Sequence, residues 1–250
     1  MGLAVAGSLA GLLVAGAGMF VTGGVVKGAL GVGLPLVVVP LLSLIVPPSQ
    51  AMGLLVLPVL LSNALQAVEG GRFGYAVRRF APLMVAQLVA TLLALSLSQD
   101  FSEQALSTAI AITVISAVTL MLLQPKGEID PRHERWAGPL VGAVAGAMAG
   151  VSSLTGPIII TYLMSLRLKR DEFVGSISIV YLFGAVPLYA AMLAWGRFGW
   201  GEVGWSALAL LPMYLGLRMG AAIRGRLSET VFRRMLLAFL VVLSLLLLLK

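Results

Sequence analysis

Two segments of the sequence place glycines or hydroxyl side chains just before a proline, within otherwise apolar surroundings. Residues 31–35 read Gly-Val-Gly-Leu-Pro, and residues 152–157 read Ser-Ser-Leu-Thr-Gly-Pro. Glycine permits the unusual backbone angles of a break, and proline suits the first turn of a helix because its missing N–H has no helical partner there. Each segment therefore predicts a short helix that begins at the break. The free N–H groups and positive dipole end of such a helix favour an anion.

Polar side chains near the breaks extend this prediction. Lys27 is the only lysine or arginine deep in an apolar stretch, and Asn63 and Gln66 lie on the apolar segment that follows the first break. The hydroxyls of the second break can donate hydrogen bonds to the oxygens of an oxyanion. The predicted anion-binding residues are Lys27, Gly31, Gly33, Pro35, Asn63, Gln66, Ser152, Ser153, Thr155, Gly156 and Pro157.

The composition defines the elements that must position these residues. Apolar residues make up 60% of the chain and charged residues 11%, whereas a water-soluble domain carries about 25% charged residues. Apolar runs of roughly 18 to 23 residues recur, long enough to cross a hydrocarbon core of about 30 Å. The chain is therefore predicted to be an all-α polytopic membrane protein. Its net charge of +7 lies largely in short loops beside apolar runs, which is typical of topology signals rather than of nucleic-acid binding.

Each candidate residue also has a structural interpretation, which the sequence leaves open. Lys27 either faces the anion or anchors a helix at the membrane interface. The hydroxyls either contact the anion or bond to a carbonyl one turn earlier, and Asn63 and Gln66 either line a cavity or join two helices. The glycines of the breaks either shape a binding site or permit close helix packing.

Residue types that carry most enzyme chemistry are scarce. The chain has no cysteine, and its single histidine, His133, lies in a polar loop. It also lacks the HExxH, GxSxG and phosphate-binding loop motifs. The sequence therefore indicates a protein that is not an enzyme, and it predicts neither a cofactor nor a metal site.

The second half of the chain repeats features of the first. Gly-Arg-Phe-Gly occurs at residues 71–74 and 196–199, and Ser-Glu precedes an apolar run at residues 102–103 and 228–229, so the offset is about 125 residues. The predicted units are a first membrane repeat over residues 1–123, a cytoplasmic linker over residues 124–135 and a second membrane repeat over residues 136–250.

Loop charge predicts the topology of these repeats. The loops rich in Lys and Arg fall on one side of the membrane if each broken segment enters and leaves on the same side; they are residues 70–79, 124–135, 167–172 and 223–234. Each repeat is then a re-entrant, broken helical hairpin plus three transmembrane helices, and the second repeat is inverted relative to the first. The alternative is a first segment that crosses completely, because residues 2–26 are longer than their counterpart.

The residues around both breaks resemble a known family. Residues 28–35, which continue to Pro40 and Leu41, and residues 142–157, which lead to Tyr162 and Leu163, are similar to the two repeat signatures of the sulfite exporter TauE/SafE family. The resemblance covers essentially the whole chain. It implies export of sulfite, organosulfonates or related small anions.

These observations together predict a secondary transporter, an exporter of a small sulfur-containing oxyanion, that works by alternating access with the anion held at the two breaks near the midplane. An anion channel that uses the same site as a selectivity filter is the alternative. The expected partners are the small anion and the lipid bilayer, and nucleic acid is not expected. A coupling proton or sodium ion and a homodimer stay open. The short loops favour a prokaryotic cell (inner) membrane.

Overall fold

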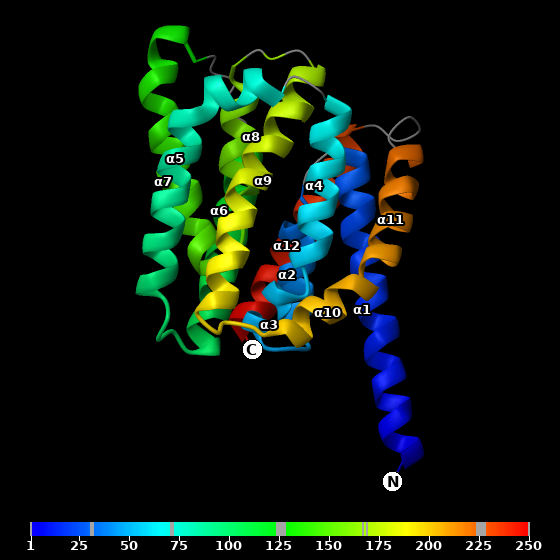
Figure 1. Ribbon diagram of the computed structural model, residues 1–250. Coiled ribbons are helices and arrows are strands. Elements are labelled where there is room, and N and C mark those ends of the chain that lie inside the picture. The colour runs from blue at the N-terminus through cyan, green and yellow to red at the C-terminus, as the bar shows by residue number, and fades with distance from the viewer. Residues whose placement is uncertain are drawn as a thin grey trace.

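The structure, a computed structural model, describes residues 2–30, 33–70, 73–123, 129–166, 168, 170–223 and 229–249, and within these ranges it contains helices and no strands. The helices drawn in Figure 1 are α1 (Gly2–Leu30), α2 (Leu34–Ser43), α3 (Pro48–Gly53), α4 (Val56–Gly70), α5 (Phe73–Leu97), α6 (Glu103–Leu123), α7 (Pro131–Ser152), α8 (Gly156–Met164), α9 (Arg170–Ala194), α10 (Trp200–Leu208), α11 (Leu210–Ile223) and α12 (Glu229–Leu249). The prediction of an all-α protein is confirmed.

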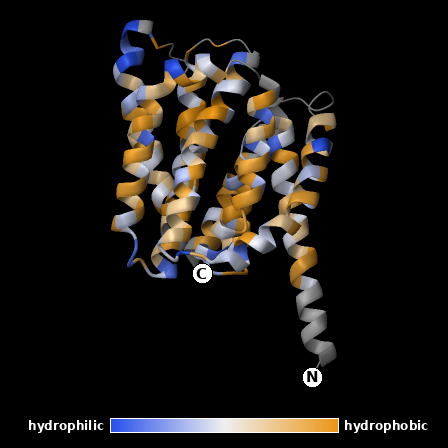
Figure 2. Cartoon of the chain, in the orientation of Figure 1, coloured by the Kyte–Doolittle hydropathy of each residue, from blue (hydrophilic) through white to orange (hydrophobic). Residues whose placement is uncertain are grey.

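Several of these helices can cross a membrane. In the described part of the chain, 5 segments are long and apolar enough, or 6 if α10 and α11, which meet at a 44° bend, count as one span. Large apolar side chains cover the outside of the bundle, as at Leu97 and Leu211, which are 78% and 68% exposed. Figure 2 shows hydrophobic residues along the middle of most helices and hydrophilic residues mainly at their ends. Lipid suits such a surface and water does not, so the chain is a polytopic membrane protein.

Both predicted breaks interrupt the helices. α1 ends at Leu30 and α2 begins at Leu34, while α7 ends at Ser152 and α8 begins at Gly156. With 10 and 9 residues, α2 and α8 are about 15 Å long at 1.5 Å per residue, which is half of a hydrocarbon core. In Figure 1, α2 lies in the lower half of the bundle and α8 in the upper half. The two short helices therefore reach the interior from opposite ends.

The chain reverses at the first break. A Cβ atom on Gly23 of α1 would lie 3.0 Å from a side-chain atom of Leu34 and 2.2 Å from one of Val38, so α2 runs back along α1. The stretch Gly11–Ala29 is nevertheless long and apolar enough to cross a membrane by itself. The first segment is therefore a hairpin with one long arm and one short arm.

Glycines bring α5 and α7 close together. Gly142, Gly146 and Gly150, spaced by one turn on α7, lie against backbone atoms of α5. Cβ atoms at these positions would lie 2.2, 2.3 and 2.6 Å from carbonyl oxygens of α5, so any side chain would force α5 and α7 apart. This is the small-residue packing that membrane helices use where water supplies no hydrophobic driving force.

The same device joins α1 to α11. A Cβ atom on Gly24 or Gly28 of α1 would lie 2.4 or 2.2 Å from a backbone oxygen of α11, and Gly216 and Gly220 of α11 meet the backbone of α1 in the same way at 2.2 and 2.1 Å. α4 packs on α9 and α6 on α12 between these two close pairs. The glycines that precede each break therefore serve close helix packing. Gly33 and Gly156, the glycines of the breaks themselves, are not part of these helix contacts.

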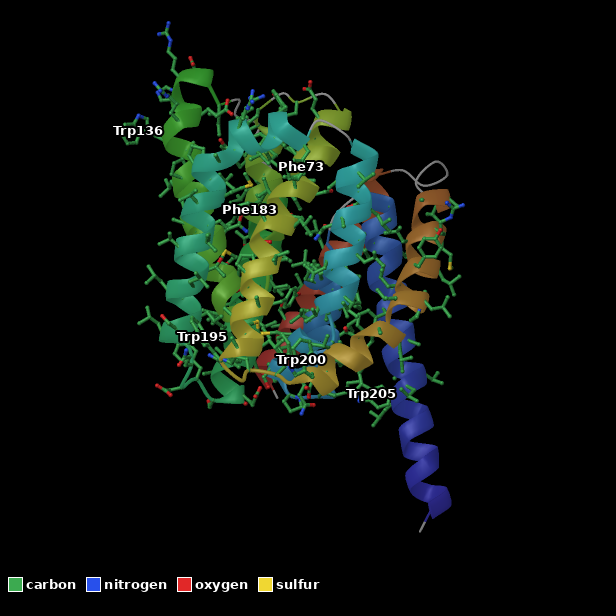
Figure 3. The ribbon with its side chains drawn as sticks, in the orientation of Figure 1. Phe73, Trp136, Phe183, Trp195, Trp200 and Trp205 are labelled. Carbon is green, nitrogen blue, oxygen red and sulfur yellow. The ribbon has the colours of Figure 1, made fainter. Side chains whose placement is uncertain are left out.

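Polar anchors mark the two ends of the bundle. Figure 3 shows Trp136 near the upper end and Trp195, Trp200 and Trp205 near the lower end, as expected of aromatic belts at the membrane surfaces. At the upper end Arg79 of α5 donates two hydrogen bonds to Glu134 of α7, with Nε to Oε1 at 2.7 Å and Nη2 to Oε2 at 2.9 Å. The α5–α7 pair is therefore fastened at its end as well as along its length.

Candidate anion site

The two breaks share one cavity. Its volume is about 40 Å³, and its polar lining comes from α1, the two breaks, α4 and α9. One water-sized sphere needs about 10–15 Å³ on this measure, so the cavity holds roughly three such spheres, which is the scale of a small anion. Its lining residues are Lys27, Gly33, Pro35, Leu36, Val59, Asn63, Ser153, Leu154, Thr155, Gly156, Tyr181, Gly184, Ala185, Leu188 and Tyr189.

The first break is shaped by a glycine that no other residue replaces easily. Gly33 has φ 102° and ψ 8°, in the left-handed region, and its carbonyl oxygen accepts the first helical bond of α2 from Val37 at 3.3 Å. Pro35 lies in the first turn, and no side chain caps the helix. The N–H groups of Leu34 and Leu36 thus have no acceptor within the helix, and they belong to the end of α2 that borders the cavity.

The second break has a serine, not a glycine, in the left-handed region, but it too leads into a helix without a side-chain cap. Ser153 has φ 58°, a strained value for a residue with a side chain, and Thr155 precedes the first turn of α8 without a side-chain cap. The Tyr181 hydroxyl donates a hydrogen bond of 2.9 Å to the Gly156 carbonyl oxygen, which ties the break to α9. The first-turn N–H groups of α8 again lie at the end of the helix that borders the cavity.

Lys27 lies inside the bundle. Its side chain is 2% exposed, and Nζ donates a hydrogen bond of 2.8 Å to Asn63 Oδ1 of α4. This geometry is inconsistent with a lysine that reaches the membrane surface. A buried ammonium is costly unless it has partners, and an amide oxygen satisfies only one of its three N–H donors. Lys27 therefore borders the cavity with an amine whose bond to Asn63 uses only one of its N–H donors.

The predicted residues divide between the cavity and its supports. Seven of them line the cavity: Lys27, Gly33, Pro35, Asn63, Ser153, Thr155 and Gly156. Ser152 instead donates its hydroxyl to the Met148 carbonyl oxygen at 2.7 Å and accepts from the Leu154 N–H at 3.3 Å, so it stabilises the turn.

Gln66 also lies away from the cavity lining. Its Oε1 accepts a hydrogen bond of 3.4 Å from the Ser178 hydroxyl, which joins α4 to α9. Gly31 lies outside the described residues. Pro157 belongs to the first turn of α8, but its side chain is outside what the structure describes.

One face of α9 supplies lining residues that the predicted set lacked. Tyr181, Gly184, Ala185, Leu188 and Tyr189 follow the three- and four-residue spacing of a single helix face. The two tyrosines were the signal in the sequence, because they are the largest hydroxyl-bearing side chains on the span that follows the second break. The Tyr189 hydroxyl adds a hydrogen-bond donor to a wall that is otherwise apolar, whereas the Tyr181 hydroxyl is already donated to the Gly156 carbonyl oxygen.

Two broken helical hairpins whose short helices border one cavity are typical of membrane transporters that contain discontinuous helices. The comparison with known families agrees with this class. A family model described as Sulfite exporter TauE/SafE matches residues 14–247, and the chain belongs to this family of membrane exporters. The resemblance found in the sequence is thereby confirmed. No curated protein and no solved structure matches the chain.

Proposed function

We propose that this protein is a secondary transporter that exports a small sulfur-containing oxyanion, sulfite or an organosulfonate, by holding it between the two helix breaks. The observation that carries the proposal is that Gly33, Gly156 and the buried Lys27 border one shared cavity. A helix N-terminus stabilises a nearby negative charge by about 0.3–1 kcal/mol at a surface and up to about 2 kcal/mol when partly buried. Two such ends and an ammonium together favour an anion over a neutral or cationic solute.

The chemistry of the lining suits an oxyanion in particular. The hydroxyls of Thr155 and Tyr189 border the same space as the Lys27 ammonium. The Tyr181 hydroxyl is already donated to the Gly156 carbonyl oxygen, and the Ser153 hydroxyl makes only a weak bond of 3.8 Å to Met192 Sδ. Donors arranged around a small volume can each bond a different oxygen of a tetrahedral or pyramidal oxyanion, and hydrogen bonds to charged groups contribute about 1.5–3 kcal/mol each. The cavity volume of about 40 Å³ limits the charged group to a few heavy atoms.

Alternating access follows from an inverted repeat, which is also a proposal. If residues 1–123 and 136–250 are equivalent units, α1 corresponds to α7 and α5 to α11. The counterpart of the α1–α11 contact in the other half is therefore the α7–α5 contact. Both of these helix pairs are observed, and both are packed through glycines. In the central contacts, α4 packs on its own counterpart α9, and α6 packs on its own counterpart α12. This correspondence supports two close pairs that rock against a central group around the fixed cavity.

The membrane potential gives the direction. An inside-negative potential favours outward movement of an anion by about 2.3 kcal/mol per charge per 100 mV, so export needs no coupling ion, although a proton or sodium ion is compatible with it. We place the protein in the cell (inner) membrane of a prokaryote.

Flux through proteoliposomes tests the proposal. The purified chain is reconstituted, loaded with sulfite or methanesulfonate, and assayed for uptake of labelled anion against the gradient of unlabelled anion. Saturable counterflow that Lys27→Met abolishes would support the transporter. Ohmic currents without counterflow would show that the protein is an anion channel and not a transporter. Vesicles that move neither sulfite nor methanesulfonate nor chloride would refute any anion transport by this chain.

A further inference from the structure

One buried polar side chain next to the cavity has no role in the site described above. Gln87 of α5 is 1% exposed, and in the described part of the chain neither its Nε2 nor its Oε1 has a hydrogen-bond partner. Buried polar groups in native proteins are nearly always bonded, because an unpaired donor or acceptor keeps the full cost of its desolvation. Among the residues that the structure describes, no protein group therefore uses the hydrogen-bonding capacity of this carboxamide, which is available to a bound molecule.

The carboxamide lies directly behind the cavity wall. A Cβ atom on Gly184 of α9 would be 2.2 Å from Gln87 Nε2, so the amide occupies the space that a side chain at position 184 would take. Gly184 itself lines the cavity, on the same face of α9 as Tyr181 and Leu188. One residue without a side chain thus separates the unpaired amide from the cavity.

We propose that Gln87 is a further anion-binding residue, whose amide N–H donates a hydrogen bond to the oxyanion past Gly184. The inference rests on the proposed function and identifies an additional ligand at the same site. Rotation about the last side-chain bonds of Gln87 turns its amide toward the cavity, because Gly184 has no Cβ in the way. Gln87 would also bring α5, which supplies none of the lining residues, into contact with the substrate.

Thr91 provides a matched control on the same helix. It lies one turn beyond Gln87, is 1% exposed, and its Oγ1 also has no hydrogen-bond partner among the described residues. No atom of Thr91 is among those nearest to the Cβ positions of Gly33, Gly156 and Gly184, the glycines that line the cavity. Thr91 therefore shares the burial and the unpaired polar atom of Gln87 but not its position beside the site.

The test compares Gln87→Met with Thr91→Val in the full chain in detergent. Both changes replace an unpaired polar group by an apolar one of similar size, so both variants are expected to unfold at the same temperature as the wild type or higher. Sulfite affinity, measured by calorimetric titration, is expected to fall roughly ten-fold or more in Gln87→Met, the loss of one hydrogen bond to a charged group. Thr91→Val is expected to bind sulfite within about two-fold of the wild type.

The outcomes separate this inference from the proposed function. A wild type that binds neither sulfite nor methanesulfonate refutes both. A wild type that binds and loses affinity in Lys27→Met, while Gln87→Met binds equally well, refutes the role of Gln87 alone. Equal losses in Gln87→Met and Thr91→Val would also overturn it, because they would show a general effect of changing the interior of α5.

Discussion

The Lys27–Asn63 pair makes a sharp prediction, because stability and anion binding should respond to its removal in different ways. Asn63 Oδ1 accepts a hydrogen bond of 2.8 Å from a lysine that is 2% exposed. The perturbation is a double-mutant cycle of Lys27→Met, Asn63→Leu and the combined variant. Methionine keeps the length of the lysine side chain and removes its charge.

The expected stabilities follow from the environment of the pair. Asn63→Leu leaves a buried ammonium without its amide acceptor, which should lower the free energy of unfolding by about 1.5–3 kcal/mol. Lys27→Met removes the buried charge itself, and replacing buried charges by apolar groups is often neutral or stabilising. The combined variant should therefore be more stable than Asn63→Leu by about 2 kcal/mol and similar to the wild type.

Anion binding should follow the charge instead. Both variants that lack Lys27 should lose sulfite affinity by roughly ten-fold or more, since each forfeits at least one charge-assisted hydrogen bond. Unfolding of the purified variants in mixed detergent gives the stabilities, and calorimetric titration with sulfite gives the affinities. Wild-type affinity in the stable Lys27→Met variant would refute the argument, because Lys27 would then be only a structural partner of Asn63.

Three further predictions concern the backbone of the site and its supports. Gly33→Ala should destabilise the protein by about 1–2 kcal/mol, because its φ of 102° is left-handed, and Gly33→Asn should recover part of the loss in thermal unfolding. Gly142→Ala should cost about 1–3 kcal/mol, since its Cβ would lie 2.2 Å from a carbonyl oxygen, whereas Gly74→Ala, with nothing within 4 Å, should not destabilise. Tyr181→Phe removes the bond to the Gly156 carbonyl oxygen and should cost about 1 kcal/mol, with a higher Km for sulfite counterflow; an unchanged Km would show that this tie does not position the break.

The breaks could be predicted from the sequence because their signal is local. Glycine and proline act on the backbone wherever they occur, so Gly33, Pro35 and Gly156 already indicate where helices end and begin. The membrane environment followed from composition for a similar reason, since hydrocarbon tolerates few charges. Neither inference needed knowledge of which residues meet in space.

The direction of each side chain could not be predicted in the same way. A helix that is apolar on all sides has no polar face to orient it, so nothing in the sequence of α1 showed that Lys27 points inward. Ser152 is the last residue of α7 and Ser153, with φ 58°, lies just beyond it, and of the two only Ser153 lines the cavity. Gln66 and Asn63, three residues apart on α4, likewise point to different partners.

The unequal chemistry of the two breaks bears on how the transporter would turn over. The ammonium of Lys27 and the amide of Asn63 belong to the first half of the chain, while the hydroxyls of Ser153, Thr155 and Tyr189 belong to the second. If the halves exchange conformations during transport, the anion keeps one charged and one neutral set of donors in both states. The Lys27 ammonium then moves with the first hairpin. The hydroxyl donors of the second half can move away from the anion while the anion stays beside the ammonium. Release would be governed by the Lys27–Asn63 side, because breaking a contact with a buried charge costs more than breaking one with a hydroxyl.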